Sequence, residues 1–112
     1  MSSMSYAVVW QDDQAEAVAP VYAGKLELGE RRLRLEGISR EGRSCLRTMR
    51  YDELGSMHMA RSGERLQGRP TLVVERTGGQ LRVGTIDGRG VLPELADQLT
   101  TRAVARAHAP RT

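Results

Sequence analysis

"TLVVERTGGQLRVGTI", residues 71–86, contains two short segments in which apolar and polar side chains alternate, separated by a threonine and two glycines. Side chains on a β-strand point alternately to its two faces, so this alternation is typical of strands with one buried face. Gly78 and Gly79 can both take the positive φ angles of a tight two-residue turn. The stretch therefore predicts a β-hairpin with strands over residues 71–76 and 80–86.

Segments of the same kind recur before this hairpin, at the spacing of about 8 to 12 residues that is typical of an all-β sandwich or barrel. Leu33 and Leu35, for example, fall on one strand face and the arginines beside them on the other. Gly55 is placed to form a β-bulge, and the acidic stretch 11–18 is predicted to be a loop. Further strands are predicted over residues 6–10, 19–29, 31–37, 44–51 and 54–61.

The last segment has the periodicity of a helix. Leu92, Leu95 and Leu99 recur at a spacing that places them on one helical face. Pro93 suits the first turn of a helix, where its missing N–H costs nothing. We therefore expect the apolar face to dock on the β-layer. The predicted elements are a helix over residues 93–107, whose opposite face carries Gln98, Arg102 and Arg106, and a frayed tail over residues 108–112.

The chain has 112 residues, 39% of them hydrophobic, which is enough for one domain with a single core. We therefore expect one domain over residues 1–112. Lys25 is the only lysine, and phenylalanine and asparagine are absent, which is the residue usage that GC-rich codons produce. This usage indicates a bacterial source, and it reduces the weight of the formal net charge of +3 as a sign of nucleic-acid binding.

Cys45 is the only cysteine, so the chain can form no internal disulfide and no cysteine-based zinc site. The first residues, "MSSMSYAVVWQDDQ", contain neither a basic leader nor a long apolar run. No segment approaches the roughly 20 apolar residues of a membrane-spanning helix. A cytoplasmic location is therefore expected.

Seven short antiparallel strands followed by one C-terminal amphipathic helix resemble the pleckstrin homology (PH) superfold, and in particular its bacterial and GRAM-like branch. "GKLELGERRLRLEG" (24–37) is similar to the first hairpin of GRAM-type domains, "TMRYDELGSM" (48–57) to their strand, polar turn and next strand, and "TLVVERTGGQLRVGTIDG" (71–88) to their late hairpin. The similarity covers residues 19–107. It implies a mainly β, PH-like small barrel or sandwich that acts as a binding scaffold for lipid headgroups, peptides or a second copy.

The resemblance also implies one candidate ligand site. PH domains that bind phosphoinositides carry a lysine and then, across a hairpin, a basic residue, any residue and arginine; Lys25, Arg32 and Arg34 match this spacing. Arginine forms bidentate pairs with phosphate, so these side chains suit an anionic membrane surface or a phosphate-bearing ligand. Three glutamates lie in the same hairpin, however, so a solvated charged face is the competing interpretation.

A second candidate site is an apolar anchor for another protein. Tyr6, Val8 and Trp10 share one face of the first predicted strand, and tyrosine and tryptophan are enriched in interface hot spots. The alternative is that Trp10 packs in the core of the domain itself. A small barrel also leaves edge strands that can pair with another chain. We expect a non-catalytic module for protein binding or self-association.

Met57, His58 and Met59 combine ligand types that suit copper or haem iron. On a strand, however, the two methionines point to one face and His58 to the other, so the three cannot converge on a metal. No nucleophile elbow, zinc-protease motif or phosphate loop is present, and aromatic residues do not alternate with basic ones. We therefore expect no enzymatic activity, no metal or other cofactor and no nucleic-acid partner.

Overall fold

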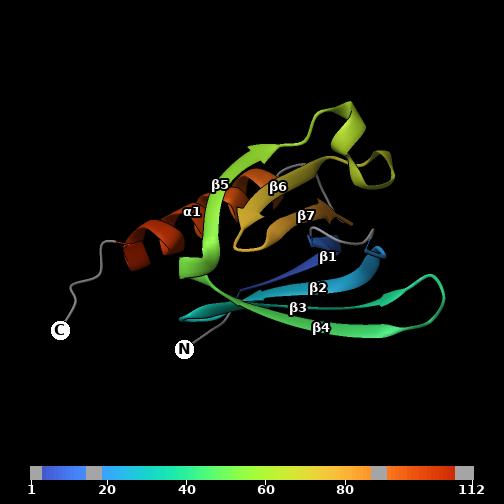
Figure 1. Ribbon diagram of the computed structural model, residues 1–112, viewed down its shortest axis with the longest axis horizontal. Coiled ribbons are helices and arrows are strands. Elements are labelled where there is room, and N and C mark those ends of the chain that lie inside the picture. The colour runs from blue at the N-terminus through green and yellow to red at the C-terminus, as the bar shows by residue number, and fades with distance from the viewer. Residues whose placement is uncertain (1–3, 15–18, 87–90, 108–112) are drawn as a thin grey trace.

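In the computed structural model of this chain, the residues described are 4–14, 19–86 and 91–107, and they form a seven-stranded antiparallel sheet and one helix (Figure 1). The fold class is therefore confirmed as mainly β with a C-terminal helix. The predicted tail, residues 108–112, lies outside the described residues. The elements are β1 (Met4–Gln14), β2 (Tyr22–Leu28), β3 (Arg32–Ser39), β4 (Ser44–Arg50), β5 (Leu54–Met59), β6 (Thr71–Arg76), β7 (Gly79–Thr85) and α1 (Val91–Ala107).

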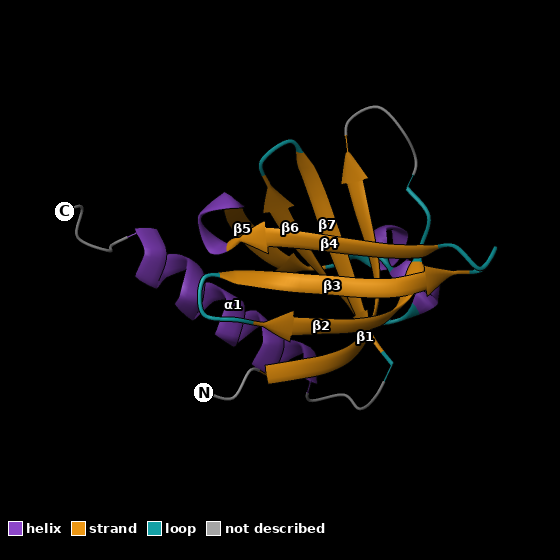
Figure 2. Ribbon diagram, turned by 90° about the horizontal axis from the view of Figure 1, so that it is seen from below, coloured by secondary structure: helices purple, strands orange, loops and turns teal. Residues whose placement is uncertain are grey.

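The strands follow the order β4-β3-β2-β1-β7-β6-β5. The sheet curls so strongly that β2, β3 and β4 run across β5, β6 and β7 (Figure 2). β1 belongs to both halves, because residues 4–10 pair with β2 and residues 8–14 pair with β7. The two ends of the curled sheet, β4 and β5, are consequently its edge strands.

β1 is longer than the predicted strand over residues 6–10, and the predicted loop over 11–18 is wrong as far as Gln14. Polar residues in this stretch indicated a loop, but the fold satisfies them internally. The Gln11 side-chain amide donates to the Ala19 carbonyl at 2.6 Å. The buried Asp12 carboxylate accepts a hydrogen bond from Arg76 at 3.1 Å. Both side chains can belong to the strand because residues outside it supply their partners, and for Asp12 that partner is 64 positions away.

The other strands lie where the sequence predicts them, with small differences at their ends. β2 begins at Tyr22 rather than at residue 19, because Pro20 has no N–H to donate to a ladder. In the late hairpin Gly79 already pairs with Arg76, so the turn is formed one residue earlier than predicted. Of the two glycines only Gly78 has a positive φ, +83°.

β5 contains the predicted bulge. Leu54 pairs with Arg76 and Met57 with Val74, so β5 carries one extra residue between these pairs. Beyond the bulge, Met57 packs against the core while His58 is exposed, as the alternation predicts. Met59 is 49% exposed, so of the two methionines predicted to share a face only Met57 packs against the core.

Helix α1 lies against the concave face of the sheet and fills it with Leu92, Leu95 and Leu99, all three fully or almost fully buried (Figure 1). The helix prediction is confirmed, with a start at Val91 rather than Pro93. Arg102 does not lie on the face opposite the leucines as predicted, because its guanidinium packs over the ring of the core residue Tyr51, 5.9 Å from the centroid.

The interface prediction for Tyr6, Val8 and Trp10 is wrong. The three side chains do share one face of β1, but that face is the concave one, and their exposed fractions are 9%, 0% and 0%. They lie in the cluster that α1 covers. Because β1 is the central strand of the curled sheet, its concave face is the centre of the core. These residues therefore form the core and not an exposed anchor.

Trp10 lies in the part of β1 that pairs with both β2 and β7, where the two halves of the curled sheet meet. Its ring stacks on Tyr22, directly opposite on β2, with the ring centroids 4.7 Å apart. Its indole N–H donates to the Glu36 carbonyl at 3.2 Å. Beside it, Gly24 and Gly37 face each other, and a Cβ on Gly24 would overlap the Glu36 carbonyl oxygen. The bend therefore requires glycine at this position.

We expect Gly24→Ala to lower the free energy of unfolding by about 2 kcal/mol or more, since backbone would have to shift to admit the methyl group. Urea denaturation measures the change. Gly63→Ala is the matched control, because a Cβ there meets nothing within 4 Å, and we expect it to alter stability by less than about 1 kcal/mol. Equal effects of the two substitutions would contradict the close approach at Gly24.

Candidate functional site

The face of β2, β3 and β4 that points away from α1 is exposed, and we call it the outer face (Figure 2). It exists because the alternation that buries Leu26, Leu33 and Met49 turns the intervening side chains outward. The pairing registers bring these outward side chains into rows across the three strands. The rows are Ala23, Ile38 and Ser44; Lys25, Glu36 and Leu46; Glu27, Arg34 and Thr48; and, at the end, Arg32 and Arg50.

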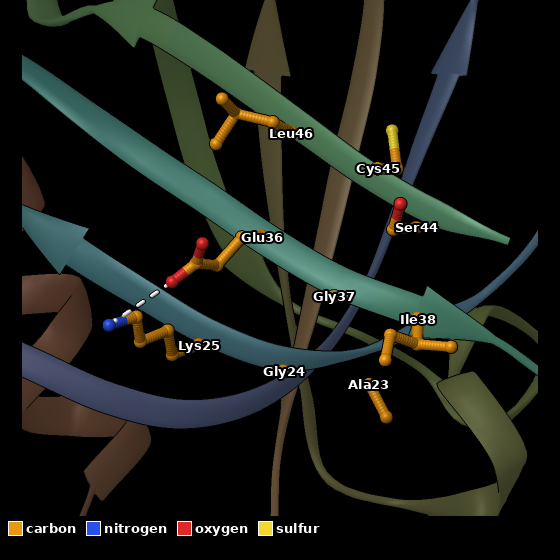
Figure 3. Close-up of a pocket in the computed structure, with 9 residues that line it drawn as sticks. All are labelled: Ala23, Gly24, Lys25, Glu36, Gly37, Ile38, Ser44, Cys45 and Leu46. Atoms are coloured by element: carbon orange, nitrogen blue, oxygen red, sulfur yellow. Dashed lines mark ion pairs between the residues drawn. The ribbon is translucent and has the colours of Figure 1, made fainter. Parts of the chain in front are cut away.

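The middle rows form a network of opposite charges. The Lys25 ammonium lies 3.1 Å from a carboxylate oxygen of Glu27 and 3.1 Å from one of Glu36 (Figure 3 draws the Glu36 pair). Arg34 extends the network to Glu36 at 3.8 Å. Hydrogen bonds from Lys25 to the two glutamates raise the pKa of its ammonium above the ordinary 10.5. Lys25 is therefore already neutralised by its neighbours.

A shallow hollow of 650 Å³ lies over this network (Figure 3). Gly24 and Gly37 line it through their backbone. Its walls include Ile38, 58% exposed, and Leu46, 51% exposed. Ile38 and Leu46 are diagonal neighbours and form one small exposed apolar patch, so the hollow is a candidate contact surface on the outer face.

Arg32 and Arg34 line a second hollow, of 500 Å³, on the other side of Leu46, together with Glu27 and Thr48. Arg32 lies directly opposite Arg50 on β4, and the Arg50 guanidinium pairs with Asp52 at 3.2 Å. The structure therefore places the three predicted cations on one face, as the alternation indicates, but it does not bring them together. Lys25 lines the first hollow and the two arginines line the second.

The free edge of β4 is a feature that sequence reasoning missed. The Ser39 N–H donates to the Arg43 carbonyl, and the Tyr51 N–H donates to the Arg31 carbonyl. These two bonds show which residues of β4 direct their backbone groups toward β3 and which direct them away. Cys45, Arg47 and Met49 consequently direct their backbone groups toward β3. The backbone groups that point away from the sheet, toward the free edge, are those of Ser44, Leu46, Thr48 and Arg50.

Asp12 forms the most buried ion pairs among the described residues, on the concave face. Its carboxylate lies 3.1 Å from Arg76 and 3.6 Å from Arg47, which reaches inward from β4. Burial raises the pKa of this carboxyl, and the two guanidiniums oppose the rise. The group favours folding most at pH values below its unfolded pKa, and that contribution is lost as the pH rises through the higher folded value. Asp12 links β1, β4 and β6 and is not open to a ligand.

His58, the histidine between the two methionines, is exposed, and its Nε2 lies 3.4 Å from a carboxylate oxygen of Glu64. Across residues 4–14, 19–86 and 91–107, no group of three side chains is placed to bind a metal ion. In the same part of the chain, no helix is long and apolar enough to cross a membrane. No protein-family model matches the chain, and no curated protein matches it.

Because Lys25 is the only lysine, its titration can be followed without assignment ambiguity. NMR of its side-chain carbons should give a pKa above 10.5. The double substitution Glu27→Gln and Glu36→Gln removes both carboxylates and should return the pKa toward 10.5. Glu41→Gln, in the exposed turn after β3, is the control and should leave it unchanged. An unshifted Lys25 in the native chain would contradict the ion-pair network.

Proposed function

We propose that this protein is a non-catalytic, PH-like binding module of the bacterial cytoplasm that contacts other proteins through the free edge of β4 and the outer face beside it. The free β4 edge, with Leu46 exposed on it, is the observation that carries the proposal. An extended segment of a partner can add to such an edge as one more strand. Main-chain hydrogen bonds then supply affinity and side-chain pockets supply specificity.

The two edges of the sheet differ in their suitability. β5 carries the bulge between Leu54 and Met57, which interrupts the regular spacing of its backbone groups. β4 pairs with β3 at every residue without a register shift, so its outward groups are evenly presented. β4 contains no proline and no glycine, and its ends are defined by a turn on each side. A partner strand would therefore find a regular template only at β4.

The order of strands and the C-terminal helix on the concave face support a PH-like fold, for which the sequence resemblance was the first reason. Proteins of this superfold present ligand surfaces on a rigid sheet, and the proposal uses the sheet in that way. Cys45, the only candidate thiol nucleophile, lies half-buried on β4 with no histidine among the residues that line its hollow. This arrangement supports a binding role rather than catalysis.

A library of seven-residue peptides, selected on the immobilised protein, tests strand addition. We expect binders whose affinity falls at least tenfold on Thr48→Pro, because proline removes an N–H that points to the free edge and leaves the β3 ladder intact. Thr48→Ala keeps that N–H and should bind normally. Circular dichroism checks that both variants fold. Binders indifferent to Thr48→Pro, or no binders at all, would contradict the proposal.

A second candidate function rests on Arg32 and Arg34, which line one hollow beside Leu46. Two guanidiniums around one hollow can form bidentate pairs with a phosphate, whereas Arg50, opposite Arg32, already pairs with Asp52 at 3.2 Å. This hollow, rather than the full set of Lys25, Arg32 and Arg34, is where an anionic lipid headgroup or another phosphate would bind. Lys25 adds little, because Glu27 and Glu36 already neutralise it.

Sedimentation with vesicles of phosphatidylglycerol and phosphatidylcholine tests this second function. If it holds, the native protein pellets with the vesicles, and the Arg32→Ala, Arg34→Ala double variant does so at least fivefold less. The control, Lys25→Ala, removes one positive charge from the same face, and this variant should pellet as the native protein does. Free inorganic phosphate that competes at millimolar concentration would indicate a phosphate site not restricted to lipid. Vesicle binding that is absent, or equal in the double variant, rules the function out.

A further inference from the structure

The sequence of β4 is self-complementary when the strand is laid antiparallel against itself. Leu46 lies midway between Ser44 and Thr48, which also direct backbone groups to the free edge. We infer that the partner at this edge is a second copy of this chain, related by a two-fold axis at Leu46. This inference rests on the proposed function and names the partner for it.

The proposed axis forms three hydrogen-bonded residue pairs across the interface. Leu46 lies opposite Leu46 of the second copy, and Ser44 lies opposite Thr48 in both directions. Each of these residues points its N–H and carbonyl at the free edge, as a hydrogen-bonded antiparallel pair requires. The Leu46 carbonyl now accepts a hydrogen bond from the exposed Arg47 guanidinium at 3.3 Å, and that side chain must release it. The two sheets would then continue as one.

The arginines of β4 select this register. With the axis at Leu46, Arg47 faces Cys45, Arg43 faces Met49 and Arg50 faces Gly42, so that no arginine meets another. With the axis at Arg47, the two copies of Arg47 lie directly opposite each other. With the axis at Cys45, Arg43 lies opposite Arg47. Like charges in direct opposition are destabilising, so both of these neighbouring registers are disfavoured.

Other registers fail for geometric reasons. If the axis passed between two residues, each outward-facing residue would lie opposite an inward-facing residue of the second copy. The backbone N–H groups of one β4 would then not meet the carbonyls of the other. An axis at Thr48 places Leu46 opposite Arg50 and Ser44 opposite Asp52, which already lies in the 3-10 turn after β4. That ladder would lose its outer pair. The axis at Leu46 keeps its outer pair, Ser44 with Thr48, inside the strand and opposes no two arginines.

The exposed apolar side chains fit the same axis. Leu46, 51% exposed, would pack against its symmetry mate on the outer face. Ile38 lies diagonally next to Leu46 in the β3–β4 register and is 58% exposed. The network of Lys25, Glu27, Arg34 and Glu36 has two charges of each sign, so it does not repel a copy of itself. An isologous interface requires this kind of self-complementarity.

Sedimentation equilibrium of the full chain from micromolar to millimolar concentration tests the inference. We expect a monomer–dimer equilibrium for the native protein and for Thr48→Ala, and a shift to monomer of at least tenfold in dissociation constant for Thr48→Pro. A native protein that stays monomeric, or a dimer unaffected by Thr48→Pro, overturns the inference. A monomer that still binds peptides through a Thr48-dependent edge would leave the proposed function standing and remove only the second copy.

Disulfide crosslinking tests the register separately. In a Cys45→Ser background, Leu46→Cys places two thiols across the axis, at the Cα separation of about 5.5 Å that a hydrogen-bonded pair has and a disulfide accepts. We expect a covalent dimer on mild oxidation. Thr48→Cys in the same background is the control, because its mate lies four residues away along the partner strand. Crosslinking at position 48 and not at 46 would overturn the proposed axis.

Discussion

The sheet depends on the contact between Trp10 and the backbone of β2 and β3. The indole stacks on Tyr22, and its N–H donates a hydrogen bond to the Glu36 carbonyl. The β2 and β3 backbones can approach each other closely here only because Gly24 and Gly37 have no side chains. This contact holds the sheet in its curl, so β2, β3 and β4 run across β5, β6 and β7. The concave face then receives α1, and the opposite face of β2 to β4 is left uncovered. The core and the candidate site are therefore consequences of the same bend.

Strand alternation, hairpins and the helix could be predicted because their signals are local. Leu33 and Leu35 on one face, the bulge near Gly55 and the leucines of α1 are all encoded within a few residues. Interactions between distant residues could not be predicted in this way. Asp12 is separated by 64 positions from Arg76, and the polar stretch that contains it resembles a loop until that partner is known. Arg102 was misplaced for the same reason, since the core that it packs against is assembled from remote segments.

The candidate site also combines features that local sequence predicts with features that depend on distant residues. Alternation placed Lys25, Arg32 and Arg34 outward, but only the register between strands shows that Glu27 and Glu36 neutralise Lys25. Register is set by turn lengths and core packing together, so the spacing of basic residues alone could not separate a ligand site from a balanced charged face. The free edge of β4 is less visible still. Which strand lies at an edge depends on the order of the whole sheet.

The arginines of β4 can be understood as a constraint on how this edge pairs. Charged side chains on an edge strand discourage indiscriminate pairing with other strands. In β4 they are spaced so that the registers with the axis at Cys45 or Arg47 oppose two arginines, while the axis at Leu46 opposes none. The same side chains that protect the edge therefore leave one self-pairing open. Arg47 adds a further condition, because it also binds Asp12 inside the curled sheet. Pairing at the edge is thus connected, through one side chain, to the ion pairs that join β4 to β1 and β6.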